Sequence, residues 1–326
     1  MLFFLCSLGW SDPFYPKTMQ GEWNPEASSR SMLLPKGWSE LDLNFSSKIS
    51  NSFRDEQGLE QSISPSIWTY NKVNVSYRHG LSNHVSVFMD VPWVLPMLFI
   101  QDGEPIYTFA LGDVSSGFQI LHSKPTSPVE IASGLTLKSP SGVEWPASAK
   151  GSPNEIQGFL TGTGTTNLTA SLAAKMNVSS FYAIRLNAAY TYKFRAVVGY
   201  LIEEDGFGHG KLKPGNAIDF QLTNYIQFHP SLSMRIAGIY SYRGIYYYGV
   251  SGAGIGWENP QELIPPGFFA DGLVSLQWEP SPLWSWKTSA QYQILGSDTQ
   301  TFATLGLDEF SPQPGWVYSL GGTRRW

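Results

Sequence analysis

The sequence predicts an all-β protein, a transmembrane antiparallel up-and-down β-barrel of about twelve strands. Segments of about nine to thirteen residues alternate apolar and polar side chains with a period of two, and almost no segment has the helical period. The charged residues of each segment share one face, apart from Arg324 at the chain's end, and the connections are alternately short and long. Strands of this length match the roughly 25 Å apolar band of an outer-membrane barrel, whereas β-sandwich strands average about five or six residues.

Each expected strand rests on the same alternation. In chain order the strands span residues 41–49, 73–78, 85–91, 114–120, 130–138, 168–176, 184–194, 218–228, 232–243, 274–279, 284–294 and 316–326. Their apolar faces are, in turn, Leu41, Leu43 and Phe45; Val73, Val75 and Tyr77; Val85, Val87 and Met89; Val114, Phe118 and Ile120; Ile131, Leu135 and Leu137; Leu168, Leu172 and Met176; Ile184, Leu186 and Tyr190; Ile218, Phe220 and Leu222; Leu232, Met234 and Ile236; Val274, Leu276 and Trp278; Trp284, Trp286 and Tyr292; Tyr318, Leu320 and Trp326. Aromatic residues concentrate near strand ends, where an interfacial girdle would place them.

The connections give the barrel its orientation. Short ones cover 79–84, 122–128, 177–180, 229–231 and 280–283, and long ones cover 50–66, 92–111, 139–166, 195–215 and 244–269. Short periplasmic turns and long extracellular loops are typical of outer-membrane barrels, so both termini are expected in the periplasm. Residues 302–307 also resemble a strand, and we assign them to an extended extracellular hairpin. Fourteen strands, with one missed in 244–269, is the alternative.

Composition excludes several classes of protein. Only 14% of the 326 residues are charged, against roughly 25% in soluble domains. A net charge of −5 leaves no basic face for nucleic acid, and the single Cys6 excludes a disulfide framework. No apolar run is long enough for a transmembrane helix. The most apolar run, 91–100, is broken by Pro92 and Pro96 and is expected to be a loop or a plugging segment.

The chain divides into three parts. Residues 1–11 are interpreted as a signal-peptide remnant, with a buried or loop N-terminus as the alternative. Residues 12–37 are expected to be a periplasmic N-terminal segment, and residues 38–326 the outer-membrane barrel. The C-terminal aromatic residue Trp326 resembles the signal read by the barrel assembly machinery, although Arg324 stands where an apolar residue is expected.

Three stretches carry a resemblance to a known group: Tyr77 to Pro92, Ala110-Leu-Gly-Asp113 to Gly117, and Gly162-Thr-Gly-Thr-Thr-Asn167 to Leu172. They resemble an outer-membrane barrel family of Gram-negative bacteria with no known function. They are also similar to the related outer-membrane transporters associated with meta-pathway phenol degradation. Ala110 and Asn167 depart from the Gly and Asp of those motifs. The resemblance implies the barrel fold, an outer-membrane location in a Gram-negative bacterium, and transport.

The charged residues on the polar faces are the candidate lumen lining, because an Arg or Lys facing the bilayer midplane costs roughly 2 to 4 kcal/mol. The candidates are Asp42, Lys48, Arg78, Asp90, Asp113, Lys138, Lys175, Arg185, Lys193, Asp219, Arg235, Arg243 and Lys287. Two interpretations remain open. The charges could form a salt-bridged plug that fills the barrel, or they could line a polar conduit or binding cavity.

Some expected loop segments are too hydrophobic to contact water alone. The candidates for an apolar gate are Trp93, Leu95, Met97 and Phe99 in one loop, and Phe268 and Phe269 in another. Folded inward, these loops would cap the lumen and capture a solute. Folded outward, they would bind a partner or lipid headgroups.

Catalysis has little support in the sequence. His79, His84, His122 and His229 are expected in short turns and His209 in a long loop, so no His is placed for a hydrolase at the lipid-facing rim. No cofactor, metal or catalytic group is predicted. We therefore expect a passive channel or binding protein for small molecules, with hydrophobic solutes among the candidates. The alternatives are a plugged structural or adhesive barrel acting through its loops, a rim lipid hydrolase, and a soluble β-sandwich. The expected partners are a small-molecule solute, outer-membrane lipids and lipopolysaccharide, and the assembly machinery.

Overall fold

The computed structural model describes residues 31–50, 52–54, 60–62, 67–99, 106–107, 109–124, 127–142, 165–202, 206–250, 261–264, 266–296 and 315–326. The predictions for the signal remnant at 1–11 and for the hairpin at 302–307 lie outside these residues. No helix in the described part of the chain is long and apolar enough to cross a membrane.

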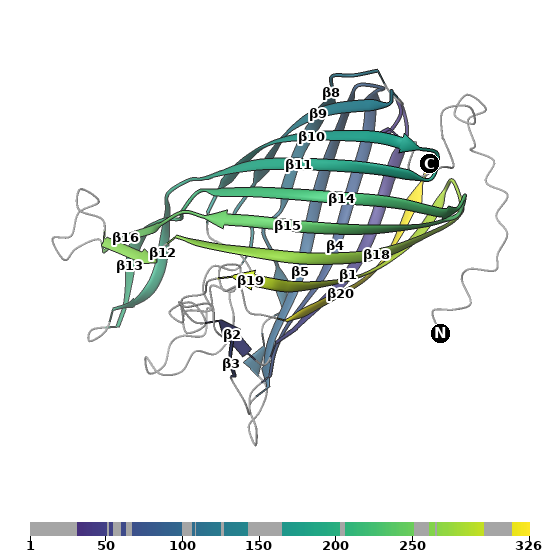
Figure 1. Ribbon diagram of the computed structural model, residues 1–326. Helices are drawn as coiled ribbons and strands as arrows, with labels where there is room; N and C mark the ends of the chain where they lie inside the picture. Colours follow the sequence, from purple (N-terminus) through teal and green to yellow (C-terminus); the bar gives the residue numbers. More distant parts are fainter. Residues whose placement is uncertain are drawn as a thin grey trace.

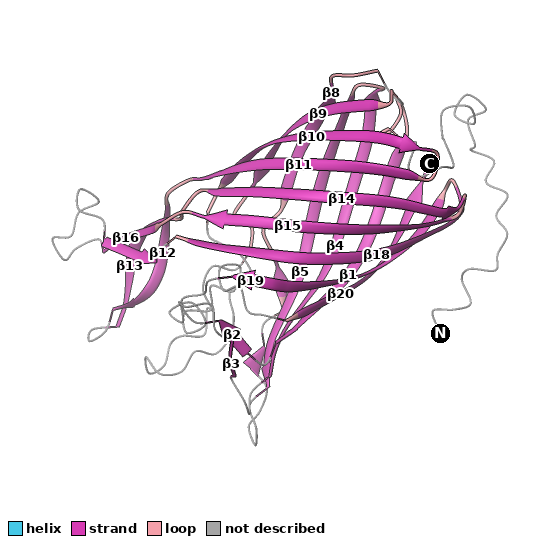
Figure 2. Ribbon diagram, viewed as in Figure 1, coloured by secondary structure: helices cyan, strands magenta, loops and turns pink. Residues whose placement is uncertain are grey.

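The described chain forms a closed antiparallel β-barrel of twelve strands, as the alternation predicted, and the fourteen-strand alternative is wrong (Figures 1 and 2). The strands are β1 (Ser39–Ser50), β4 (Ile67–Ser82), β5 (Val85–Phe99), β8 (Ser115–Leu121), β9 (Val129–Lys138), β10 (Asn167–Ser179), β11 (Tyr182–Lys193), β14 (Ala217–His229), β15 (Leu232–Arg243), β18 (Gly267–Ser281), β19 (Trp284–Gly296) and β20 (Trp316–Arg325). Each strand pairs with its neighbours in sequence, and β1 closes the sheet by pairing with both β4 and β20. Two-residue strands β6 (Ile106–Tyr107) and β7 (Ala110–Leu111) add to β5.

The two faces of the barrel wall differ in chemistry. On β1, the outward side chains of Leu41, Leu43 and Phe45 are exposed, and the register continues this outward row to Gly322 of β20 and Val75 of β4. The same row of exposed large apolar side chains recurs around the barrel, for example at Leu172, Leu222 and Leu320. Because a pleated strand alternates its side chains, the charged residues of the barrel strands face inward, with Arg324 as the exception. An outward apolar belt of this kind suits a barrel that faces lipid.

The short and long connections lie at opposite ends (Figure 1). Tight turns at the short-turn end join β4 to β5, β10 to β11, β14 to β15, and β18 to β19, and the C-terminus lies at this end too. At the other end, the expected long loops at 195–215 and 244–269 contain strands that pair with one another. These are β12 (Ala196–Ile202), β13 (Gly206–Lys213), β16 (Tyr246–Val250) and β17 (Gln261–Ile264), which pair in this order as a second sheet. The strands β2 (Ser52–Arg54) and β3 (Glu60–Ser62) form a small hairpin.

The apolar segment from Trp93 to Phe99 is not a loop, and this corrects the sequence prediction. It continues β5 and pairs with β4 along its length, Trp93 opposite Val73 and Phe99 opposite Ile67. The prolines are tolerated for a geometric reason. The carbonyl of Pro92 accepts a hydrogen bond from the Gly112 N–H at 2.8 Å, so the position of its missing N–H points away from β4. A strand can lose a donor on the side where its neighbour is incomplete.

The remaining gate candidates are also in the wall. Phe268 and Phe269 belong to β18, opposite Tyr242 and Ser241 of β15. Phe268 faces outward, where it stacks on Tyr240 at a centroid distance of 6.3 Å. Phe269 faces inward beneath the Arg243 guanidinium, 5.3 Å from its ring centroid. Trp93 is outward and stacks on Phe109, whereas Leu95 is half-buried and shares the outward parity of Trp93. Met97 and Phe99 are placed by backbone pairing alone.

Residues 31–37 fold back against the inside of the wall at the short-turn end. Gly37 has a φ of 81°, and the Trp38 N–H bonds the Pro35 carbonyl at 3.1 Å, which together make a tight turn. Leu33 packs on the inward residues Leu121 and Ala132, and the Met32 N–H donates to the Glu130 carboxylate at 2.7 Å. A Cβ on Gly80 would lie 2.1 Å from the Pro35 carbonyl oxygen, so only glycine admits this close approach.

A matched pair of arginine substitutions on β14 tests the direction of the wall. Leu222 faces outward near the middle of the strand, and its neighbour Gln221 faces inward. We expect Leu222→Arg to lower the free energy of unfolding in lipid vesicles by about 3 kcal/mol and Gln221→Arg to lower it by far less. Denaturant titration of both variants measures this difference. Equal losses would contradict the assignment of the faces.

Candidate functional site

The inward face of the barrel carries charges of both signs, placed there by the strand register. Its cations are Lys48, Lys72, Arg78, Lys138, Lys175, Arg185, Lys193, Arg235, Arg243, Lys287 and Arg325. Its anions are Glu40, Asp42, Asp90, Asp113, Glu130, Asp219, Asp271 and Glu279, with Asp113 just before β8. Every residue proposed from the sequence as lumen lining lies on this face.

Six inward charges are absent from the candidates proposed from the sequence: Glu40, Lys72, Glu130, Asp271, Glu279 and Arg325. Asp271 and Arg325 are examples. Both continue the alternation of their strands, Asp271 in step with Ser275 and Arg325 in step with Thr323. The signal was therefore present. Arg325 lies beside Arg324, which faces outward and places its guanidinium 5.2 Å from the ring centroid of Trp284. Because the two arginines are adjacent in sequence, the sequence alone did not show that Arg325 faces the lumen and Arg324 faces outward.

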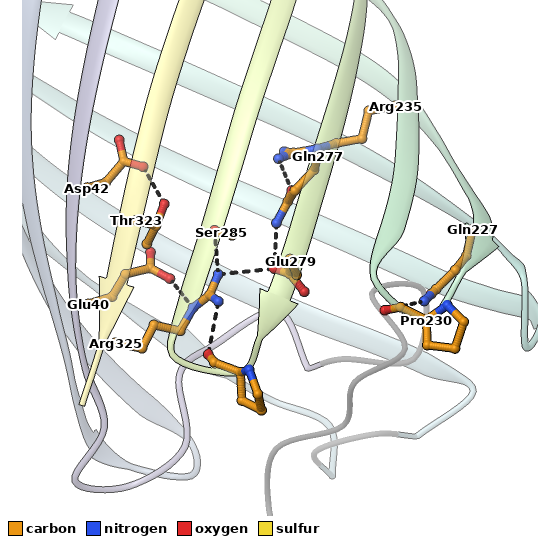
Figure 3. Close-up of polar contacts among 11 residues, drawn as sticks. Glu40, Asp42, Gln227, Pro230, Arg235, Gln277, Glu279, Ser285, Thr323 and Arg325 are labelled. Carbon is orange, nitrogen blue, oxygen red and sulfur yellow. Dashed lines mark hydrogen bonds and ion pairs between the residues drawn. The ribbon is translucent and has the colours of Figure 1, made fainter. Parts of the chain in front are cut away.

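Arg325 is the centre of a polar network at the short-turn end (Figure 3). Its Nε donates to the Glu40 carboxylate at 2.8 Å, and one terminal nitrogen lies 3.3 Å from both Glu279 Oε1 and Ser285 Oγ. The other terminal nitrogen donates to the Pro282 carbonyl at 3.2 Å. The Arg325 and Glu279 side chains are 5% and 6% exposed, so this buried arginine holds β20 to β1 and to the β18–β19 turn.

The network extends along the wall to β15. The Gln277 amide donates to Glu279 at 2.7 Å and accepts from Arg235 at 2.7 Å (Figure 3). Nearer the long-loop end, Arg243 pairs with Asp219 at 3.2 Å. These contacts join side chains of the same or nearby strands. They brace the wall in the plane of the sheet.

A cavity of about 350 Å³ lies on the inner wall where β4, β5, β8 and β9 meet. It is lined by the charged side chains of Lys72, Arg78, Asp90, Asp113 and Lys138. The rest of the lining is mostly polar, namely Tyr70, Asn74, Ser76, Pro92, Val94, Gly112 and Ser115. This volume is at the lower end of the range for small-molecule pockets. The lining suits a small polar solute.

Asp113 shapes one side of this cavity. It follows Gly112, whose N–H bonds the Pro92 carbonyl, in the Ala110 to Asp113 motif singled out in the sequence. One Asp113 carboxylate oxygen accepts from the Gly142 N–H at 3.1 Å, and the other lies 3.3 Å from Lys138 Nζ. Its side chain is 1% exposed. The Asp113 carboxylate therefore holds the segment before β8 to the segment after β9 through an ion pair and a hydrogen bond.

Three serine–histidine pairs occur at the short-turn end. Ser39 Oγ and His79 Nδ1 share a hydrogen bond of 2.9 Å, and Ser39 is buried. His122 bonds Ser133, and His229 bonds Ser231, each at 2.8 Å. In the first pair the two residues are directly opposite each other on β1 and β4, so the bond links the ends of these two strands. All three lie at the short-turn end. The rim hydrolase hypothesis requires its pair at the long-loop end.

Comparison with known proteins gives the fold. No protein-family model matches the sequence, and no curated protein matches it. Among solved structures, an outer membrane channel from Pseudomonas putida F1 superposes with a TM-score of 0.66 and 10% identity, over 92% of this chain and 98% of that one. The translocator domain of the autotransporter NalP from Neisseria meningitidis (TM-score 0.46, 8% identity, 90% of each chain) superposes less well. So does a mutant of the TodX monoaromatic hydrocarbon channel (0.42, 11%, 93% and 92%). The fold is therefore that of an outer-membrane barrel.

Removal of the Arg325 guanidinium tests the network. Arg325→Met leaves the half-buried Glu40 and the buried Glu279 carboxylates uncompensated, and we expect it to lower the free energy of unfolding by about 3 kcal/mol. Adding Glu279→Gln should recover part of that loss. The control Arg324→Met removes an outward, partly exposed cation that lies over the Trp284 ring and should cost under about 1 kcal/mol. The stability of all three variants is measured as the midpoint of a denaturant titration, with heat-modifiable gel mobility as the readout of the folded fraction. An Arg325→Met midpoint no lower than the control midpoint would refute the role of Arg325.

Proposed function

We propose that this protein is a passive channel for small molecules in the outer membrane of a Gram-negative bacterium. The observation that carries the proposal is the inner wall: a closed barrel with an apolar exterior carries a continuous lining of charged and polar side chains and a polar cavity. Buried charges of this kind cost free energy unless they are solvated or paired. A water-filled path satisfies them, and the fold shared with an outer membrane channel supports the same conclusion.

The inner-wall contacts favour a conduit over a plug. The network around Arg325 and the Asp219–Arg243 pair run along the wall, so they leave the centre of the barrel to solvent or solute. The segment 31–37 narrows the short-turn mouth on the β4, β8 and β9 side. We propose that this segment is the constriction that limits flow.

Polar solutes are favoured over hydrophobic ones. The apolar segments that were expected to capture hydrophobic molecules are built into the wall as parts of β5 and β18. The cavity on the inner wall is lined mainly by charged, hydroxyl and amide groups. A solute that hydrogen-bonds these groups replaces the water it displaces, whereas an apolar solute leaves them unpaired.

The outer surface suggests the remaining partners. Exposed Trp278, Trp284 and Trp286 gather at the short-turn end, where an aromatic girdle contacts lipid headgroups. Outer-membrane lipids and lipopolysaccharide are the proposed surroundings. Trp326 extends the closing seam, because its N–H and carbonyl both bond Ser39 at 3.1 and 2.9 Å. We propose it as the residue read by the assembly machinery.

Conductance in planar lipid bilayers tests the proposal. The refolded protein should give discrete current steps, and a variant lacking residues 1–36 should give larger ones because the constriction is removed. Heat-modifiable mobility must show that both proteins are folded. The absence of steps from both folded proteins would overturn the channel and favour a filled barrel that acts through its loops.

A further inference from the structure

The inner wall is more positive than the chain that builds it. The whole chain has a net charge of −5, yet on the inward face of the described strands eleven cations meet eight anions. The strand register therefore sorts charge, with a positive surplus inside the barrel. A low-dielectric wall focuses that field into the lumen, which raises the local concentration of anions.

Within the lumen, the cavity beside β4 and β5 presents a cation suited to bind a ligand. The Asp113 carboxylate is occupied by Lys138 and the Gly142 N–H, so it adds little repulsion toward an anion. Arg78 lines the same cavity and is exposed to it, and it makes no hydrogen bond or ion pair within the described part of the chain. A guanidinium presents a planar fork of donors that matches a carboxylate.

Polar neighbours extend the site along β4. Asn74 and Ser76 share the inward face with Arg78, and the Asn74 amide donates to Ser76 Oγ at 2.7 Å. That bond leaves the Asn74 carbonyl oxygen as an acceptor and the Ser76 hydroxyl as a donor toward the cavity. A ligand with hydroxyl groups near its carboxylate could bond all three side chains.

Asp90 supplies the opposing charge. It lies opposite Ser76 on β5, diagonal to Arg78, and also makes no hydrogen bond or ion pair within the described residues. A carboxylate held by Arg78 is repelled by the Asp90 carboxylate that lines the same cavity. A conducting site must bind its solute weakly enough to release it, and this pairing of an attracting and a repelling group meets that requirement.

We infer that the cavity on the inner wall of β4, β5, β8 and β9 is a binding site for a small hydroxylated carboxylate. Arg78 is the residue that binds the carboxylate. Asn74 and Ser76 bond the hydroxyl groups of that solute, and Asp90 weakens its binding. This inference rests on the proposed channel function and gives it a substrate class. The cavity volume of about 350 Å³ gives room for a single sugar acid.

Two measurements on the full chain in planar bilayers test the inference. With a potassium chloride gradient, the reversal potential should be shifted from zero toward the equilibrium potential of chloride, which indicates that anions permeate better than cations. Gluconate added to the bath should block the current in a concentration-dependent way, and sorbitol, a neutral molecule of similar size, should not. Arg78→Gln should raise the half-blocking gluconate concentration about tenfold, and Asp90→Asn should lower it by a similar factor.

Arg324→Gln is the matched control, because Arg324 faces outward and should leave both measurements unchanged. A current without anion preference, or gluconate block unaffected by Arg78→Gln, would overturn this inference and leave the channel standing. Equal effects of Arg78→Gln and Arg324→Gln would overturn it too, since the effect would not arise in the cavity. The absence of current from folded wild-type protein would instead overturn the proposed channel function itself.

Discussion

The pairing of the first barrel strand with the last is the interaction on which the rest of this molecule depends. In hydrocarbon, an unpaired backbone N–H or carbonyl costs several kcal/mol, so a sheet that spans lipid must close. Strands β1 and β20 close it from Glu40 opposite Arg325 to Ile49 opposite Trp316. Arg325 reinforces this seam from inside, and the Ser39–Trp326 backbone bonds reinforce it at the end. Closure defines an inside, and the pleat then decides which side chains enter it.

The inside is organised on two walls. Around β15, β18, β20 and β1, a polar network joins Arg235, Glu279, Arg325 and Glu40 through Gln277. Around β4, β5, β8 and β9, the β5–β8 and β8–β9 pairings are short, and the wall holds a cavity with Arg78 and Asp90 facing it. The network braces the first wall, and the cavity of the second wall is available to a solute. The segment 31–37 covers the short-turn end of that second wall.

The sequence predicted the barrel well because the alternation of apolar and polar residues can be recognised in each strand separately. The strand number, the polar faces and the order of short and long connections all followed from local alternation. Features that depend on a neighbouring strand were predicted less well. Pro92 suggested a loop, since only the structure shows that its missing donor points away from β4. The cavity depends on where Arg78, Asp90 and Asp113 meet across separate strands, and the contact of Leu33 with Leu121 depends on a long-range fold-back that no local pattern encodes.

The central claim is that alternate residues of each strand face water inside and lipid outside. Cysteine accessibility along β14 tests it most directly, with Cys6 replaced by Ser to remove the single native thiol. In lipid vesicles, a water-soluble thiol reagent should modify cysteines at Asp219 and Gln221 rapidly and cysteines at Phe220 and Leu222 at least about tenfold more slowly, because thiolate formation requires water. Equal modification of all four positions would contradict a lipid-facing wall. Protection of all four would contradict a water-filled lumen.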